Sequence, residues 1–146
     1  MDGSGLNEGD YAGICALQGC FGFIGLTRRE GRLHLVVQCM GTEDGSMAPA
    51  AEGKLRELTL LSSEESVVRL KLEADFEEMR DKAFFYYKRI AEEGGPGLAK
   101  WVMADCRHKL RFRLDHFTGC RFGLTVFSTK EAGGSADFSD FVYRLR

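Results

Sequence analysis

The stretch Val67-Val68-Arg69-Leu70-Lys71-Leu72-Glu73 alternates apolar and charged side chains from Val68 onward. Successive side chains of a β-strand point to opposite faces, so this pattern predicts a strand with one buried face and one face in water. Further strands are expected wherever similar apolar runs recur between turn residues.

Glycine-containing breaks divide the N-terminal part of the chain into short apolar runs. Gly19-Cys20 separates Tyr11–Gln18 from Phe21–Thr27, and Glu30-Gly31 separates Phe21–Thr27 from Arg32–Met40. A two-residue break containing glycine between apolar runs is typical of a β-hairpin. The sequence therefore predicts three consecutive antiparallel strands, followed by a loop over the small polar residues 41–53.

A second hairpin is predicted where Lys54–Leu61 and Val67–Glu73 flank the polar turn Ser62–Glu65. The next stretch, Ala74–Glu93, supports two interpretations. Apolar residues recur there at helical spacing, whereas the four consecutive aromatics Phe84–Tyr87 favour a strand. The pattern alone leaves helix and strand open.

Beyond the break at residues 94–97, further runs are read as strands, and the chain closes on an aromatic-rich one. These runs are Leu98–Ala104, Lys109–Asp115, Phe122–Val126 and Phe138–Leu145. About eight or nine short strands with regular turns predict an all-β sandwich of two antiparallel sheets. We predict one domain over residues 1–146, with a flexible polar terminus at residues 1–8.

Composition predicts a soluble protein without a nucleic-acid or membrane partner. The net charge is −2 and no run of 18 apolar residues exists. The one basic cluster, Arg107–Arg113, alternates with apolar residues and is read as the water-facing side of a strand. The N-terminus lacks the pattern of a signal peptide, so we expect a cytoplasmic location.

The five cysteines are odd in number and none lies in a CxxC pair. Together with three scattered histidines, this spacing predicts no zinc site. Cys15, Cys39 and Cys106 lie among apolar neighbours and are interpreted as small core residues. Unclustered thiols fit a reducing compartment better than a disulfide scaffold.

No catalytic residue is predicted, because the phosphate-binding and GxSxG motifs are absent. Asp115 and His116 are adjacent and could be taken for a catalytic pair. Adjacent residues of a strand point to opposite faces, so we do not expect these two side chains to act together. Asp137 and Asp140 flank Phe138 near a glycine loop, where carboxylates could bind calcium or simply solvate the strand. We predict no cofactor and keep calcium as the alternative.

Three aromatic residues are candidates for stacking on a sugar ring: Trp101, Tyr86 and Tyr87. Large aromatics also pack in cores, and the sequence leaves both roles open.

The last third of the chain resembles the C-terminal concanavalin A-like β-sandwich of family-43 glycoside hydrolases, the β-xylosidase and α-L-arabinofuranosidase group. The resemblance lies in "HFTGCRFGL" at 116–124, "STK" at 128–130 and "GGSADFSDF" at 133–141. Upstream, "GDYAGICALQG" at 9–19 and the following "FGFIGL" at 21–26 are similar to consecutive strands of that module. Val68–Ala74 and Ala83–Tyr87 are similar to its middle strands.

The resemblance implies a jelly-roll sandwich in which Ala74–Glu93 forms two strands with a turn near Arg80–Lys82. That module usually begins with further strands before the "GDYAG" run, so we expect a sandwich that lacks its first strands. The exposed edge would favour self-association into a homo-oligomer. Ser139 stands where the family has a second aspartate, which weakens the calcium alternative, and Cys120 stands where an aromatic is common.

In that family, two acidic residues of an N-terminal five-bladed propeller hydrolyse the glycosidic bond with inversion. The resemblance therefore implies a non-catalytic module of an enzyme acting on xylan or arabinose-containing oligosaccharides, packed on the catalytic propeller. It also implies that the turn carrying His116, Phe117 and Thr118 reaches the substrate pocket, with Phe117 as the inward aromatic. The alternatives are a free-standing, lectin-like carbohydrate-binding domain and an intracellular protein-interaction module.

Overall fold

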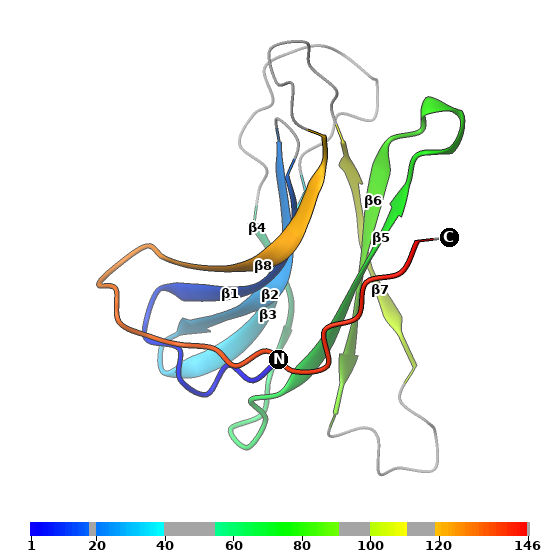
Figure 1. The fold of residues 1–146 in the computed structure, drawn as a ribbon. Coiled ribbons are helices and arrows are strands. Elements are labelled where there is room, and N and C mark those ends of the chain that lie inside the picture. Colours follow the sequence, from blue (N-terminus) through cyan, green and yellow to red (C-terminus); the bar gives the residue numbers. More distant parts are fainter. Residues whose placement is uncertain (18–19, 40–54, 91–99, 111–118, 146) are drawn as a thin grey trace.

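The computed structural model describes residues 1–17, 20–39, 55–90, 100–110 and 119–145, and it consists of two stacked antiparallel sheets (Figure 1). The predicted all-β sandwich is confirmed. The contested stretch 74–93 contains two strands over its described part, as the resemblance implied.

The larger sheet has five strands in the order β4-β3-β2-β1-β8. These are β1 (Asp10–Leu17), β2 (Phe21–Arg29), β3 (Arg32–Gln38), β4 (Leu55–Leu60) and β8 (Arg121–Ser128). The predicted hairpins between β1, β2 and β3 are confirmed. Glu30 and Gly31 both adopt positive φ, at 51° and 72°, which suits the tight turn between right-twisted strands.

The smaller sheet has three strands in the order β5-β6-β7. These are β5 (Val68–Asp75), β6 (Lys82–Arg89) and β7 (Val102–Lys109), with a short 3₁₀ turn, η1 (Glu77–Met79), between β5 and β6.

The predicted second hairpin is wrong. β4 and β5 alternate as expected, but they belong to different sheets, so the turn Ser62–Glu65 carries the chain across the sandwich. Leu61 and Val68, on either side of this turn, are fully buried between the layers. Alternation identifies a strand and its buried face, but it does not identify the neighbouring strand.

Two predictions for the C-terminal half also differ from the structure. β7 is one strand that spans parts of both predicted runs, Leu98–Ala104 and Lys109–Asp115, although residues 111–115 lie outside the described residues. Phe138–Leu145 forms no strand, and the apolar side chains of Phe141, Val142 and Leu145 are largely exposed.

Glu65 fixes the turn that crosses between the sheets. Its carboxylate accepts hydrogen bonds from the N–H and the hydroxyl of Ser62, both at 2.9 Å, and from two guanidinium nitrogens of Arg89 at the end of β6. The paired Arg89 holds the pKa of Glu65 at about 2, well below its ordinary value. One charged group therefore closes the turn and ties it to β6 of the small sheet.

The lowered pKa predicts that stability is lost as pH falls from about 4.5 to about 2, because the folded state prefers the ionised carboxylate. We expect Glu65→Gln to lower the free energy of unfolding by about 2 kcal/mol at pH 7, allowing for solvent screening of this near-surface pair. The variant should also lose part of the difference in stability between pH 7 and pH 3, measured by urea unfolding. Glu64→Gln, at the exposed neighbouring position, is the matched control. Equal acid sensitivity of Glu65→Gln and the parent chain would contradict this assignment.

The core lies between the layers, where β5 packs over β1, β6 over β2 and β7 over β3. One cluster fills the end near the turn Ser62–Glu65, and a second fills the opposite end, where Ala16, Ala83 and Leu110 meet. The even-numbered residues of β1 and β2 face this core, which matches their alternation.

His108 corrects the interpretation of the basic cluster. The residue is fully buried on the inner face of β7, not in water, and its ring lies near the ring of Phe85, with centroids 6.4 Å apart. The ring occupies the space above Gly22, where an added Cβ would lie 2.5 Å from the imidazole Cγ. Arg107 keeps the predicted outward direction.

The outer face of the five-stranded sheet carries an aromatic cluster that no sequence pattern predicted. Tyr11 and Phe127 stack with centroids 4.8 Å apart, and Phe23 packs edge-on against Phe127 at 5.7 Å. Phe23 is fully buried although it points away from the space between the sheets. Alternating residues on both faces of β2 are therefore buried.

Residues 1–8, predicted to be flexible, lie against the sandwich. Met1 pairs with Val68 through both backbone groups, and Asp2 bridges Val67 on one side and Asp137 on the other. Leu6 is buried in the core. The start of the chain thus occupies a ladder position beside β5.

Candidate functional site

One end of the sandwich gathers the strand ends that lead into the segment singled out by the sequence. β1 ends there at Leu17 opposite Arg121 of β8, and β7 ends there at Lys109 opposite Lys82 of β6. The second core cluster joins the two sheets at this end. Leu110 and Cys120, described residues on either side of the segment 111–118, therefore both lie at this end.

Both roots of that segment are anchored. Leu110 is fully buried, and its N–H donates to the Asp81 carbonyl at 2.7 Å. On the other side, Phe122 at the start of β8 packs against the same core cluster. The predicted pocket residues His116, Phe117 and Thr118 lie between these roots, outside the described residues.

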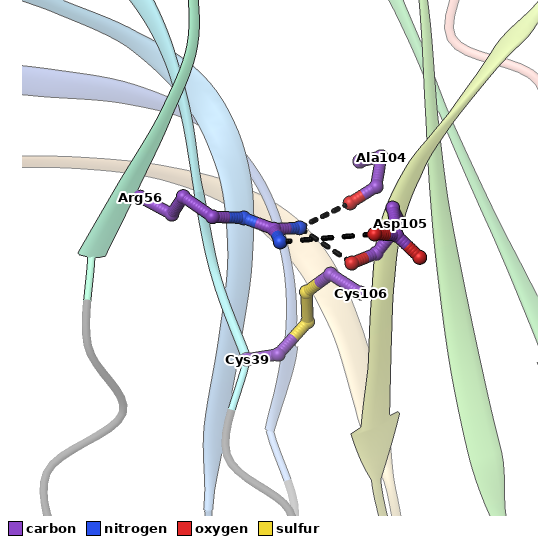
Figure 2. Close-up of a disulfide and its surroundings, with 5 residues drawn as sticks. All are labelled: Cys39, Arg56, Ala104, Asp105 and Cys106. Carbon is purple, nitrogen blue, oxygen red and sulfur yellow. Dashed lines mark hydrogen bonds and ion pairs between the residues drawn. A yellow bond between two sulfur atoms is a disulfide. The ribbon is translucent and has the colours of Figure 1, made fainter.

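A disulfide between Cys39 and Cys106 braces this end (Figure 2). It joins the end of β3 in the large sheet to β7 in the small sheet, with Cα atoms 6.1 Å apart. The interpretation of these two cysteines as free thiols is therefore wrong. The two residues are separated by 67 positions in sequence, so nothing in the local pattern could pair them. The cytoplasmic location stays a prediction. The disulfide removes the argument that unclustered thiols fit a reducing compartment.

Arg56 of β4 adds a second link beside the disulfide. Its guanidinium donates to the carbonyl of Ala104 at 2.9 Å and to that of Asp105, and it lies 4.0 Å from the Asp105 carboxylate (Figure 2). Asp105 adopts a φ of 29° where the pairing of β6 with β7 shifts register. This bulge turns two carbonyls toward Arg56, and a surface hollow lined by both residues and the disulfide lies there.

Two of the three free cysteines, Cys15 and Cys120, have thiols that burial makes less acidic. Burial raises the pKa of the Cys15 thiol and raises that of Cys120 to about 11. The thiolate is the reactive form, so these two side chains stay protonated near neutral pH.

The structure brings together two of the three predicted sugar-stacking residues. The Lys71 ammonium lies 4.1 Å from the Tyr86 ring centre and 5.2 Å from that of Trp101, on the outer face of the three-stranded sheet. Trp101 is 43% exposed. Tyr87 points to the other face and packs against both core clusters, away from the other two.

Asp137 and Asp140 are both exposed. The backbone of Asp137 pairs with Asp2, and Asp140 adopts a φ of 54° where the chain leaves this ladder. Within the described ranges, no three acidic, histidine or cysteine side chains are grouped to hold a metal ion. The calcium alternative stays a prediction. The described residues also include no helix that is long and apolar enough to span a membrane.

A family model described as the β-xylosidase C-terminal concanavalin A-like domain matches residues 1–144. The chain belongs to this family. The motifs at 116–124 and 133–141, which carried the resemblance, lie inside the matched region of this C-terminal domain.

Solved structures of family-43 enzymes contain a similar sandwich. A bifunctional GH43-CE protein of Bacteroides eggerthii is 29% identical with a TM-score of 0.65. An engineered GH43 glycoside hydrolase with endo-xylanase and exo-arabinofuranosidase activity has a TM-score of 0.67 at 23% identity, which supports the fold alone. Each alignment covers 91% of this chain, but it covers 15% and 26% of the respective neighbour. Comparison with curated proteins gives no match.

Proposed function

We propose that this domain is the non-catalytic C-terminal module of a glycoside hydrolase acting on xylan or arabinose-containing oligosaccharides. The family match over residues 1–144 carries the proposal. The Bacteroides eggerthii neighbour supports it, because most of that protein lies outside the aligned part. A module of this kind has a catalytic domain as its partner, and we propose that this partner is a five-bladed propeller.

The braced end is the surface that we assign to this partner. The disulfide Cys39–Cys106 and the Arg56 contacts hold the large and small sheets together there, and Leu110 anchors the chain just before residues 111–118. A loop that leaves a fixed scaffold can place a side chain against a neighbouring domain at a low entropic cost. This favours a steric role for Phe117, which would narrow the pocket and exclude water from it.

Phe117→Ala in the full enzyme, propeller included, tests this role. We expect KM for short xylo-oligosaccharides to rise about threefold to tenfold, with a smaller change in kcat, because an apolar wall of the pocket is lost. Selectivity for short over long substrates should fall. Met103→Ala, which removes an exposed apolar side chain from the outer face of β7, is the control.

Unchanged kinetics for Phe117→Ala would remove the proposed pocket role. Binding of xylose or xylan by the isolated chain at millimolar concentration, lost in Trp101→Ala, would instead favour the free-standing carbohydrate-binding alternative. The exposed Trp101 beside Tyr86 is the observation that keeps this alternative testable.

A further inference from the structure

We propose that the outer face of the three-stranded sheet is a second carbohydrate site, whose ligand is a xylan-type chain that carries carboxylate groups on acidic sugar branches. The xylan backbone of this ligand rests on the proposed function. The carboxylate is argued from the residues of this face alone. The site holds the polymer and takes no part in the pocket to which we assign Phe117.

The outer face of the three-stranded sheet, which points away from the large sheet, is basic, although the whole chain carries a net charge of −2 (Figure 1). Leu70 and Phe85 face the core, so the residues that alternate with them on β5 and β6 point outward. Asp105, at the bulge of β7, lies toward Arg56 of the large sheet. Among the described residues, the outward basic side chains are Arg69, Lys71, Lys82, Lys88, Arg107 and Lys109, and the outward acidic ones are Glu73 and Asp75. The surplus of positive charge on this face attracts an anionic ligand.

Two of these cations lie directly opposite each other near one end of the sheet. Arg69 of β5 pairs with Lys88 of β6, and directly paired residues share a face with Cβ atoms roughly 5 Å apart. Like charges at such a position destabilise the sheet. Lys71 follows Arg69 on the same face, roughly 7 Å further along β5. A carboxylate bound among these three cations would offset their mutual repulsion.

The ammonium group of Lys71 is held in place by its neighbours. It donates to the Glu73 carboxylate at 3.2 Å and lies 4.1 Å from the Tyr86 ring centre and 5.2 Å from that of Trp101. Glu73 comes two residues after Lys71 on β5, so it lies on the side away from Arg69. An ammonium group has three donors, and the carboxylate of Glu73 takes one of them. A cation positioned in this way loses little entropy when it binds an anion.

Trp101 provides an apolar surface beside these cations. Val102 pairs with Tyr87, so Trp101, one residue earlier, lies alongside Lys88. The Trp101 side chain is 43% exposed although the Lys71 ammonium lies near its ring. Met103, opposite Tyr86 on the same face, is also exposed. The C–H face of a sugar ring can pack on such a surface while the cations bind an acidic branch of the same chain.

The site lies at the end of the three-stranded sheet away from residues 111–118. The pair Arg69 and Lys88 is near one end of the β5–β6 ladder, whereas Lys82 and Lys109, which pair beside the braced end, are at the other. A polymer bound at Trp101 therefore leaves the braced end open to the catalytic domain. Binding at this site can be measured separately from the pocket role of Phe117.

Affinity electrophoresis of the 146-residue chain tests the site with two polymers that differ only in charge. One is glucuronoxylan, and the other is the same preparation after its carboxylates have been reduced to alcohols. We expect the dissociation constant for the acidic polymer to be at least about tenfold lower, because only this polymer forms charge-assisted hydrogen bonds with the cations. Raising the NaCl concentration from about 20 mM to about 300 mM should remove most of that difference.

Two substitutions separate stacking from charge. Trp101→Ala should weaken binding of both polymers about tenfold, because both carry the sugar backbone. Lys88→Gln should weaken binding of the acidic polymer about fivefold and leave the reduced polymer unchanged. Phe76→Ala and Lys130→Gln, which remove an exposed aromatic and an exposed cation from other parts of the surface, are the matched controls and should change neither affinity.

The Tm of each variant shows whether a loss of binding reflects unfolding. Lys88→Gln is a substitution on the outer face and should shift Tm by less than about 2 °C, so the charge arm can be read even if Trp101→Ala is unstable.

Equal affinity for the acidic and the reduced polymer would overturn the proposal, and it would favour the lectin-like alternative, which needs no charge. Equal affinity for dextran sulfate, a polyanion without a xylan backbone, would also overturn it, as would the absence of any retardation by glucuronoxylan. None of these measurements involves hydrolysis or the catalytic domain. They can therefore fail while the Phe117→Ala result stands, and the reverse also holds.

Discussion

Replacing Cys39 and Cys106 together with serine is expected to lower the free energy of unfolding by about 4 kcal/mol. The bridge closes a loop across 67 residues, and a cross-link over that span removes much of the entropy of the unfolded chain. The loss should be large relative to the total stability of a domain of this size. This loss in the free energy of unfolding is measured by urea unfolding of the double variant and of the parent chain under oxidising conditions.

A reductant distinguishes the disulfide from simple packing of two cysteines. Dithiothreitol should destabilise the parent chain by nearly as much as the double substitution does, and it should destabilise Cys15→Ser by the same amount, because that variant keeps the bridge. The double variant, which has no bridge, should not respond to the reductant. Thiol titration of the unfolded, unreduced chain should count three free thiols, since two of the five cysteines are bonded. A count of five in protein folded under oxidising conditions, with no effect of reductant, would contradict the bridge.

The strands were predictable from sequence because each carries its own evidence. Alternation in Val68–Glu73 indicates which residues are buried, and Glu30-Gly31 indicates a turn that needs positive φ. The local sequence does not indicate which strand each strand pairs with. The turn Ser62–Glu65 is polar in either case, and whether it closes a hairpin or crosses between sheets depends on contacts far away in sequence.

Buried polar and sulfur-containing residues were harder to place for the same reason. His108 lies in a basic, alternating stretch and reads as a surface residue, yet Gly22 on β2 leaves the space that accepts its ring. Cys39 and Cys106 are brought together only when β3 and β7 stack. Each of these residues is explained by a partner in the opposite sheet.

Part of the candidate site could likewise be predicted from local sequence, and part of it could not. The motif at 116–124 identified the family, because ordered residues in one segment carry that signal. The bracing by Arg56 needed the structure, because its partners are backbone carbonyls of Ala104 and Asp105, and carbonyls have no sequence signature. Sequence therefore indicated the family and the segment to which we assign the pocket role, and the structure shows how the described residues on either side of that segment are held.

Gly25→Ala is expected to lower the free energy of unfolding by about 3 kcal/mol, against the rule that glycine weakens a strand interior. Gly25 pairs directly with Gly13, and an added Cβ would lie 2.0 Å from the Ala12 carbonyl oxygen and 2.6 Å from the Phe23 ring. Relieving these contacts requires β1 and β2 to separate, or Phe23 to leave its aromatic cluster. The packing cost should therefore exceed the entropic gain of about 1 kcal/mol that alanine brings.

Gly123→Ala on β8 is the matched control, because an added Cβ there meets nothing within 4 Å. Both positions are interior to strands of the same sheet, so propensity alone predicts the same small gain at each. Close approach of the backbones predicts that alanine lowers the free energy of unfolding at Gly25 and raises it slightly at Gly123. Urea unfolding of the two variants distinguishes strand propensity from close approach. Equal changes in the free energy of unfolding at the two positions would show that the close contact between Gly25 and β1 does not determine the effect of alanine.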